Sequence, residues 1–146
     1  MQREARRLLL LRRQSLIADV ARKQALRALA EALDTEARSA ALAARSRGLV
    51  NASGARLGDT TGAALRARAD FTAGLSHVAV QAGEAARDAA RQRIWQAETL
   101  TRAETRARRL SERVDEARAA LAAAKAQREA ARELPLARKL QSRAES

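Results

Sequence analysis

Small and apolar residues recur at two of every seven positions between Leu65 and Ala131. Their spacing alternates between three and four, so the stripe has a repeat of about 3.5 residues. We call such a stripe a seam, and it predicts a helix about 100 Å long, at about 1.5 Å per residue, that packs on a partner helix. The seam positions are Leu65, Arg68, Thr72, Leu75, Ala79, Ala82, Ala86, Ala89, Arg93, Gln96, Leu100, Ala103, Ala107, Leu110, Val114, Ala117, Leu121, Ala124, Arg128 and Ala131.

The same lettering continues through residues 1–47 and predicts a first helix there. Its part from Leu26 to Ala44 is uniformly small or aliphatic, whereas the earlier part has charged seam positions, so pairing there is weaker or specified by polar contacts. The predicted seam of this helix is Ala5, Leu9, Arg12, Leu16, Asp19, Lys23, Leu26, Ala30, Leu33, Ala37, Ala40 and Ala44.

Residues 48–62 are rich in glycine, asparagine and serine and predict a loop. We expect Gly48 to end the first helix in a left-handed conformation, with Leu49 as the apolar contact that follows. Asp59, Thr60 or Thr61 could cap the second helix, because Asp and Thr side chains accept hydrogen bonds from the first free N–H groups of a helix.

The second helix is predicted over residues 63–134, because Pro135 disfavours helical geometry in the residue before it. Residues 135–146 then form a tail, either a short helix or disordered. If the loop turns at its middle, Ala44 pairs near Leu65 and Leu9 near Leu100, and the part beyond about Arg108 overhangs. Residues 1–146 thus predict a single all-α unit, an elongated antiparallel two-helix coiled-coil hairpin whose second helix is longer.

Composition supports this fold and narrows the chemistry. Phe71 and Trp95 are the only aromatic residues, and alanine, leucine, arginine and glutamate dominate. There is no cysteine, which excludes disulfides, thiolate zinc sites and cysteine nucleophiles. The aliphatic run from Leu8 to Leu11 is too short for a membrane span or a signal peptide, so the cytoplasm is the expected location.

The net charge of +12 is compatible with nucleic acid, an anionic membrane or an acidic protein as partner. Arginine far outnumbers lysine and alanine is abundant, as a GC-rich genome would encode. The charge alone therefore assigns no partner.

No catalytic, metal or cofactor site is expected. His77 is the only histidine and has no second ligand at metal spacing. The stretch from Gly54 to Gly62 lacks the lysine and hydroxyl residue of a phosphate-binding loop and follows no strand. We therefore expect a protein that is not an enzyme and has no small-molecule substrate.

Three apolar groups are candidate interaction sites. The run Leu8, Leu9, Leu10 and Leu11 is apolar around most of the helix, so one partner helix cannot cover it. Phe71 and Leu75 share a face near the turn, where they either close the coiled coil or form a knob for a partner. Ile94 and Trp95 fall at outward positions, where they form an interaction patch or pack against the edge of the first helix.

These features together resemble the FliJ family of stalk proteins of the flagellar type III export apparatus, which are related to stalk proteins of virulence secretion systems. The resemblance covers nearly the whole chain: a basic two-helix hairpin, an Asn/Gly/Ser loop, and Phe71-x-x-x-Leu75 early in the second helix. The opening Arg6-Arg7-Leu8-Leu9-Leu10-Leu11-Arg12-Arg13 looks like the Leu- and Arg-rich opening of that family. The alanine-rich seam and the scarcity of Gln and aromatic residues depart from it.

The resemblance implies a protein that inserts its terminal end into the hexameric export ATPase and promotes assembly of that ring. Leu8 to Leu11 would contact the ring, and Phe71 with Leu75 would contact the membrane export gate protein. Such a protein can also hold export chaperones, and it resides in the cytoplasm, peripherally associated with the inner membrane at the export apparatus.

Two other classes of function stay open from the sequence. One is a basic coiled coil that binds nucleic acid, which the absence of a recognised basic-region or aromatic stacking motif disfavours. The other is a structural coiled coil that self-associates through its overhang.

Overall fold

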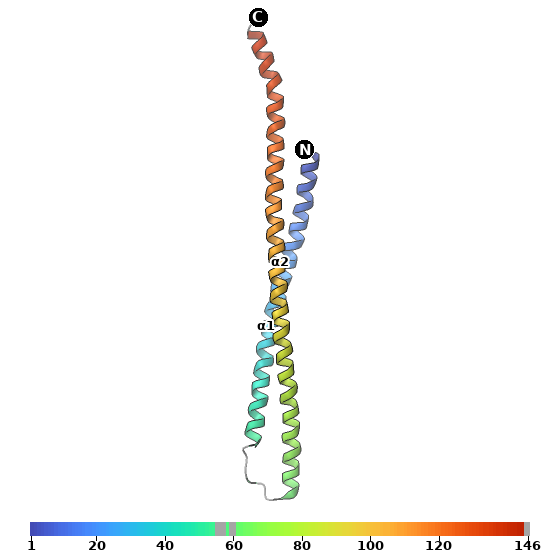
Figure 1. The fold of residues 1–146 in the computed structure, drawn as a ribbon, viewed down its shortest axis with the longest axis vertical. Helices are drawn as coiled ribbons and strands as arrows, with labels where there is room; N and C mark the ends of the chain where they lie inside the picture. The colour runs from blue at the N-terminus through green and yellow to red at the C-terminus, as the bar shows by residue number, and fades with distance from the viewer. Residues whose placement is uncertain (55–57, 59–60, 145–146) are drawn as a thin grey trace. The chain divides into compact units, whose positions relative to one another are not determined.

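The computed structural model describes residues 1–54, 58 and 61–144, and these form two helices and no strand. Helix α1 spans Gln2–Gly54 and helix α2 spans Gly62–Ala144 (Figure 1). The chain divides into unit 1, made of Met1–Lys23 and Arg102–Ser146, and unit 2, made of Gln24–Thr101. Each unit pairs a segment of α1 with a segment of α2. The predicted all-α fold of two packed helices, the second longer, is confirmed.

The core of unit 1 is a small cluster of aliphatic side chains shared by both helices. Early residues of α1 lie beside late residues of α2: Glu4 and Arg7 line a hollow with Glu116 and Ala120. Asp19 lies further along α1 and lines another hollow with residues 104–111 of α2, so the segments are antiparallel. The cluster consists of Leu8, Leu11, Ala18, Leu110, Val114 and Ala117, with Ala107 and Leu121 packed against it.

The core of unit 2 is made almost entirely of alanine. One buried hydroxyl, that of Ser46, donates to the carbonyl oxygen of Leu42 at 2.8 Å, so its burial leaves no donor unsatisfied. An ion pair joins the two helices, with Arg93 Nε 2.7 Å from Glu36 Oε2, and both side chains are about two-thirds buried. The buried alanines of this unit are Ala25, Ala32, Ala43, Ala82 and Ala89.

The predicted seam of α2 is confirmed over most of its length. Every seam position from Arg68 to Ala124 is buried or half-buried. Leu65 at the start of the helix and Arg128 and Ala131 near its end are exposed. The 3.5-residue repeat of α2 therefore marks its contact with α1.

The predicted seam of α1 is wrong by one residue. The side chains that face α2 lie one position earlier, and the predicted seam residues Leu9, Leu16, Leu26 and Leu33 have exposed fractions of 65%, 69%, 50% and 48%. In unit 2 the buried seam residues are alanine and serine, and leucine at those positions would hold the two helices further apart. The buried or half-buried seam of α1 is Glu4, Leu8, Leu11, Ser15, Ala18, Arg22, Ala25, Leu29, Ala32, Glu36, Ser39, Ala43, Ser46, Val50 and Ser53.

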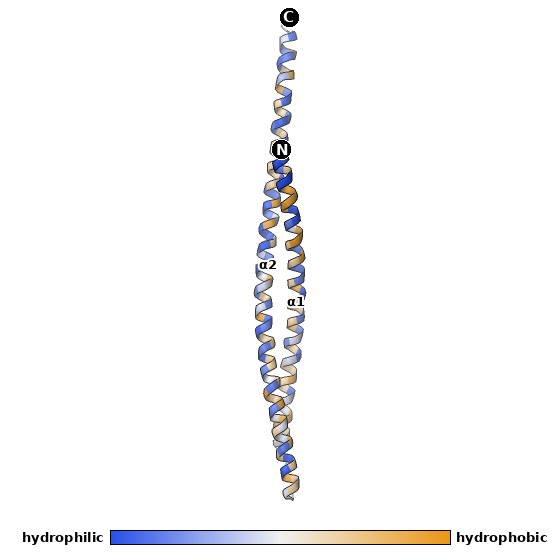
Figure 2. Ribbon diagram, turned by 90° about the vertical axis from the view of Figure 1, so that its right-hand side faces the viewer, coloured by the Kyte–Doolittle hydropathy of each residue, from blue (hydrophilic) through white to orange (hydrophobic). Residues whose placement is uncertain are grey.

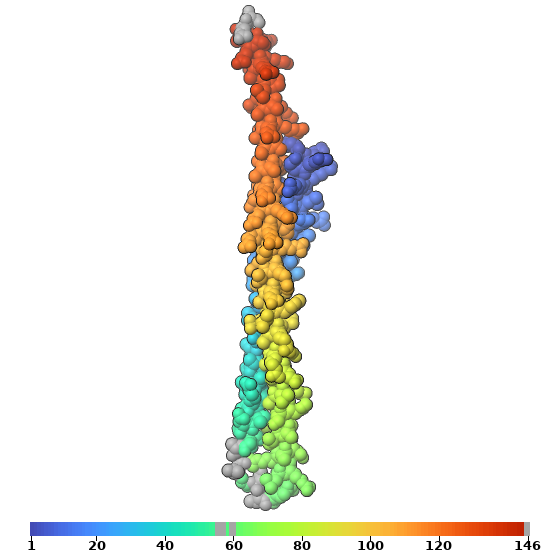
Figure 3. Space-filling view, in the orientation of Figure 1, coloured from blue at the N-terminus to red at the C-terminus, as the bar shows by residue number. Residues whose placement is uncertain are grey.

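The predicted pairing of the arms, and an overhang beginning near Arg108, are also wrong. Leu110, Val114 and Ala117 are buried against the first turns of α1. Past Ala124 every described residue of α2 is exposed, and the red part of α2 in Figure 3 has no other segment beside it on the face shown. The overhang is real but starts after Ala124, about four helical turns later than expected.

Helix α1 also does not end at Gly48. It continues to Gly54, since Val50 and Ser53 still pack on α2 and this contact outweighs the cost of about 1 kcal/mol for a glycine inside a helix. The positive φ among the described residues is at Gly58, at 143°. At the start of α2, the Ala64 N–H donates to Thr61 Oγ1 at 3.2 Å, which confirms Thr61 as a cap. Asp59 and Thr60 lie outside the described residues.

Helix α2 does not end before Pro135 but runs through it to Ala144. Proline removes one N–H donor, so the carbonyl one turn earlier loses its intrahelical partner. This part of α2 is exposed, and water can bond to that carbonyl. The expected tail of residues 135–146 is therefore helical as far as Ala144.

The register of unit 2 can be tested with two neighbouring residues. Ala32→Leu should lower the free energy of unfolding by about 1–3 kcal/mol, because the 8% exposed alanine faces α2 and a leucine there would push the two helices apart. Leu33→Ala should change it by less than about 0.5 kcal/mol, because Leu33 lies outside the seam. Urea unfolding followed by circular dichroism measures both, and the reverse order of effects would show that Leu33 occupies the seam.

Candidate functional site

The turn end of unit 2 is tied together by polar contacts between the two helices. The Arg68 guanidinium donates to the carbonyl oxygen of Ser53 at 3.3 Å, and the hydroxyls of Ser53 and Thr72 are 3.4 Å apart. These contacts hold the last turn of α1 against α2. They also explain how Arg68 occupies a seam position, because its charged group reaches a backbone carbonyl in the last turn of α1.

A groove lies beside these contacts, with a volume of about 340 Å³. We call it the turn groove. Phe71 on its wall is 63% exposed, whereas Leu75, one helical turn further along α2, is half-buried in the seam. Phe71 thus leaves most of its ring available to a partner and does not close the end of the coiled coil. The groove is lined by Leu49, Ala52, Ser53, Arg68, Phe71 and Leu75.

Leu49 is a member of this site that the sequence reasoning missed. It was assigned to the loop because α1 was expected to end at Gly48. The longer α1 brings it into the turn groove, where it is 51% exposed. The signal that could have found it is the seam itself, which continues through Ser46, Val50 and Ser53.

The leucine run near the start of α1 is divided between two environments. Leu8 and Leu11 are 5% and 9% exposed and pack on α2, whereas Leu9 and Leu10 are 65% and 62% exposed. The hydrophobic colouring of α1 is strong in this region (Figure 2). The expectation that one partner helix cannot cover the run is confirmed. A contact with another protein would use Leu9 and Leu10.

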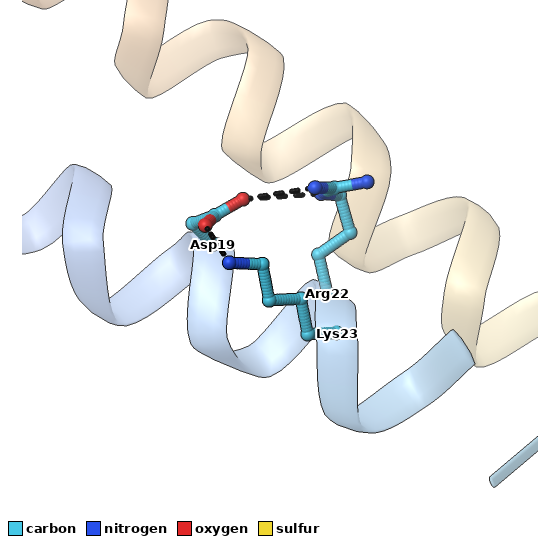
Figure 4. Close-up of polar contacts among 3 residues, drawn as sticks. All are labelled: Asp19, Arg22 and Lys23. Atoms are coloured by element: carbon cyan, nitrogen blue, oxygen red, sulfur yellow. Dashed lines mark hydrogen bonds and ion pairs between the residues drawn. The ribbon is translucent and has the colours of Figure 1, made fainter. Parts of the chain in front are cut away.

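Asp19 lies next on α1 and neutralises two neighbouring cations (Figure 4). Its Oδ1 accepts from Arg22 Nη2 at 3.0 Å, and its Oδ2 is 3.2 Å from Lys23 Nζ. These hydrogen bonds, chiefly that from Arg22, hold the pKa of the Asp19 carboxyl below its ordinary value. The pair also keeps the charge of Arg22, a seam residue, at the surface.

Ile94 and Trp95 lie on the outer side of α2, as their heptad positions predict. Their exposed fractions are 49% and 53%, so neither is covered by α1. Their role in binding a partner stays a prediction. His77 is also exposed on α2.

Within the described residues, no group of acidic or histidine side chains is placed to hold a metal ion. In the same residues, no helix is both long and apolar enough to cross a membrane. Comparisons with protein-family models, with curated proteins and with solved structures give no match. The candidate sites are therefore the exposed apolar side chains at the turn groove, at Leu9 and Leu10, and at Ile94 and Trp95.

The exposure of Phe71 leads to a stability prediction. Phe71→Ala should change the free energy of unfolding by less than about 0.5 kcal/mol, since most of the ring is already in water. The buried Leu110 offers a matched control, because Leu110→Ala should cost about 2–5 kcal/mol. Thermal and urea unfolding measure both, and a loss of about 3 kcal/mol for Phe71→Ala would mean that the ring closes the coiled coil.

Proposed function

We propose that this protein is a non-enzymatic stalk component of a type III protein export apparatus, the role of the FliJ family that its sequence resembles. It inserts into the export ATPase hexamer, promotes assembly and activity of that ring, and links it to the membrane export gate. It acts in the cytoplasm, peripherally associated with the inner membrane at the flagellar export apparatus. Export chaperones are further partners.

One observation carries the proposal: Phe71 projects from the turn groove of an antiparallel helix pair. Exposed aromatic residues beside an apolar groove are the residues that most often dominate a protein interface. The second helix places Leu75 one turn away, and Leu49 widens the apolar surface from the first helix. This is the part of the chain that the resemblance assigns to the export gate.

The residues of unit 1 support a second contact. Leu9 and Leu10 are exposed on α1, and the described residues of α2 past Ala124 are exposed as well. An apolar pair and an uncovered helix are what a surrounding protein ring could bury. Leu8 and Leu11 support such a contact from behind by anchoring α1 on α2.

The contact with the ATPase is tested by Leu9→Asp combined with Leu10→Asp. Stimulation of the ATPase by the protein should be lost, because two apolar side chains that the ring would bury are replaced by charges. Helicity should stay unchanged, because both residues are exposed in the protein alone. A coupled ATP-hydrolysis assay and circular dichroism measure the two quantities. Full stimulation by this double variant would exclude Leu9 and Leu10 as the ring contact.

The contact with the gate is tested at Phe71. Phe71→Ala should weaken binding to the cytoplasmic part of the gate by at least about 2 kcal/mol, as expected of a central interface residue. Calorimetry measures the affinity, and Val80→Ala, which truncates an exposed apolar side chain of α2 outside the candidate sites, is the matched control. ATPase stimulation should survive in both variants.

Three results would contradict the proposal as a whole. One is a wild-type protein that neither binds the gate nor stimulates the ATPase. Another is tight, strongly salt-dependent binding to duplex DNA at physiological salt without binding to either export protein, which would favour the nucleic-acid class. The third is a stable dimer in sedimentation that leaves Leu9, Leu10 and Phe71 inaccessible.

A further inference from the structure

Five large aliphatic side chains occupy the outward side of α1 in unit 1. Their spacings of three, four and seven residues place them on one helix face, directly opposite Leu8, Leu11 and Ala18 in the core. Arg13 lies at the centre of this face. We call the whole the Arg13 face, and its apolar members are Leu9, Leu10, Leu16, Ile17 and Val20, with exposed fractions of 65%, 62%, 69%, 59% and 53%.

The Arg13 face is positively charged and its charge is not balanced locally. The two acidic residues of this α1 segment are already engaged, Glu4 with the chain's amino group at 2.6 Å and Asp19 with two cations. Arg6, Arg12 and Arg13 have no carboxylate partner among the described residues. Unit 1 as a whole carries nineteen of the 29 basic residues but nine of the 17 acidic ones.

We propose that the Arg13 face is a docking site for an amphipathic helix of an acidic partner protein. The arrangement specifies that helix: apolar side chains one heptad apart would contact Leu9 with Leu10 and Leu16 with Ile17. A carboxylate between them would pair with Arg13. The docked helix would form a third layer over α1, on the side that α2 does not cover.

Other occupants fit the face less well. An anionic membrane would place Arg13, the central residue of the apolar face, at the deepest point of insertion, where a charge is most costly. A second copy of the chain would bring like charges together at Arg13 and Arg6. Nucleic acid would leave five exposed aliphatic side chains against phosphates. A carboxylate-bearing helix is the occupant that satisfies both the apolar residues and the arginine.

This inference shares Leu9 and Leu10 with the proposed ATPase contact but requires no export protein. It adds Leu16, Ile17 and Val20, and it names the chemistry of the partner. A designed peptide can test it separately from ATPase stimulation, so the two ideas can fail independently.

The probe is a synthetic helical peptide of about three heptads, roughly 31 Å long, with leucine at the contact positions and glutamate between and beside them. We expect saturable one-to-one binding to the full-length protein by fluorescence anisotropy. The same peptide with lysine for glutamate should not bind. Leu16→Ser combined with Ile17→Ser should weaken binding by about tenfold or more, the scale of losing a central apolar contact. Both residues are exposed, so the variant should stay folded.

A charge exchange tests the role of Arg13 directly. Arg13→Glu should weaken binding of the acidic peptide by about tenfold, and a peptide with one central lysine should restore it. Arg45→Glu is the matched control, because it changes the net charge equally from an exposed position in unit 2. It should leave the affinity within about twofold of wild type, the size of a screened surface effect.

Four results would overturn the inference. The first is an equal loss of peptide affinity for Arg13→Glu and Arg45→Glu. The second is unchanged peptide affinity in the Leu16→Ser, Ile17→Ser variant. The third is binding of the wild-type protein, but not of this double variant, to phosphatidylserine vesicles. The fourth is a dimer of the wild-type protein in sedimentation that becomes a monomer in the same double variant. Either of the first two results would mean that the acidic peptide binds only through general electrostatic attraction. The third would identify a membrane, and the fourth a second copy of the chain, as the occupant of the Arg13 face.

Discussion

Close approach of two helix backbones is the constraint on which the rest of this structure depends. The buried seam of unit 2 is alanine and serine, side chains that lose little rotamer freedom on burial but also bury little area each. Stability must then be spread along the whole contact. The Glu36–Arg93 pair adds specificity: a slip of the helices past each other would separate the two charges and leave both partly desolvated without a partner.

The small size of the seam residues also determines which side chains lie outside the contact between the helices. Because alanine and serine occupy the buried contact of unit 2, leucines of α1 there lie at its flanks and outer side, as at Leu26 and Leu33. A chain with little bulk in its core thereby carries much of its large apolar surface in solvent. Exposed apolar patches of this kind are typical of proteins that work by contacting other proteins.

Periodicity predicted the helices well and the contacts of α1 poorly. In α2 a single stripe satisfies the heptad repeat, so the seam predicted from Leu65 to Ala131 is correct from Arg68 to Ala124. In α1 two adjacent stripes repeat every seven residues, and the one richer in leucine looks more hydrophobic. The stripe with smaller residues faces α2, because the contact requires small side chains. That requirement depends on how the two helices pair, which the repeat alone does not reveal.

Local signals misled wherever tertiary contacts decided the outcome. Gly48 and Pro135 each indicated a helix end, but packing of Val50 and Ser53 carries α1 past Gly48 and hydration permits Pro135. The candidate sites also divide into those that local sequence signals predict and those that tertiary contacts decide. Phe71 was found from its type and spacing, and Trp95 from its heptad position. Leu49, Leu16 and Ile17 were not, because their places depend on where α1 ends and which stripe it buries.

The part of α2 beyond Ala124 has a consequence for local stability. A helical segment of about twenty residues with no covering partner depends on its own backbone hydrogen bonds and on the paired helix that nucleates it. Its turns therefore open and reclose on a timescale near 0.1–1 μs, and amide hydrogens there exchange far sooner than those near Leu110. A protein that binds this segment must supply the free energy to hold it helical, so its affinity depends on ordering α2 as well as on contacting it.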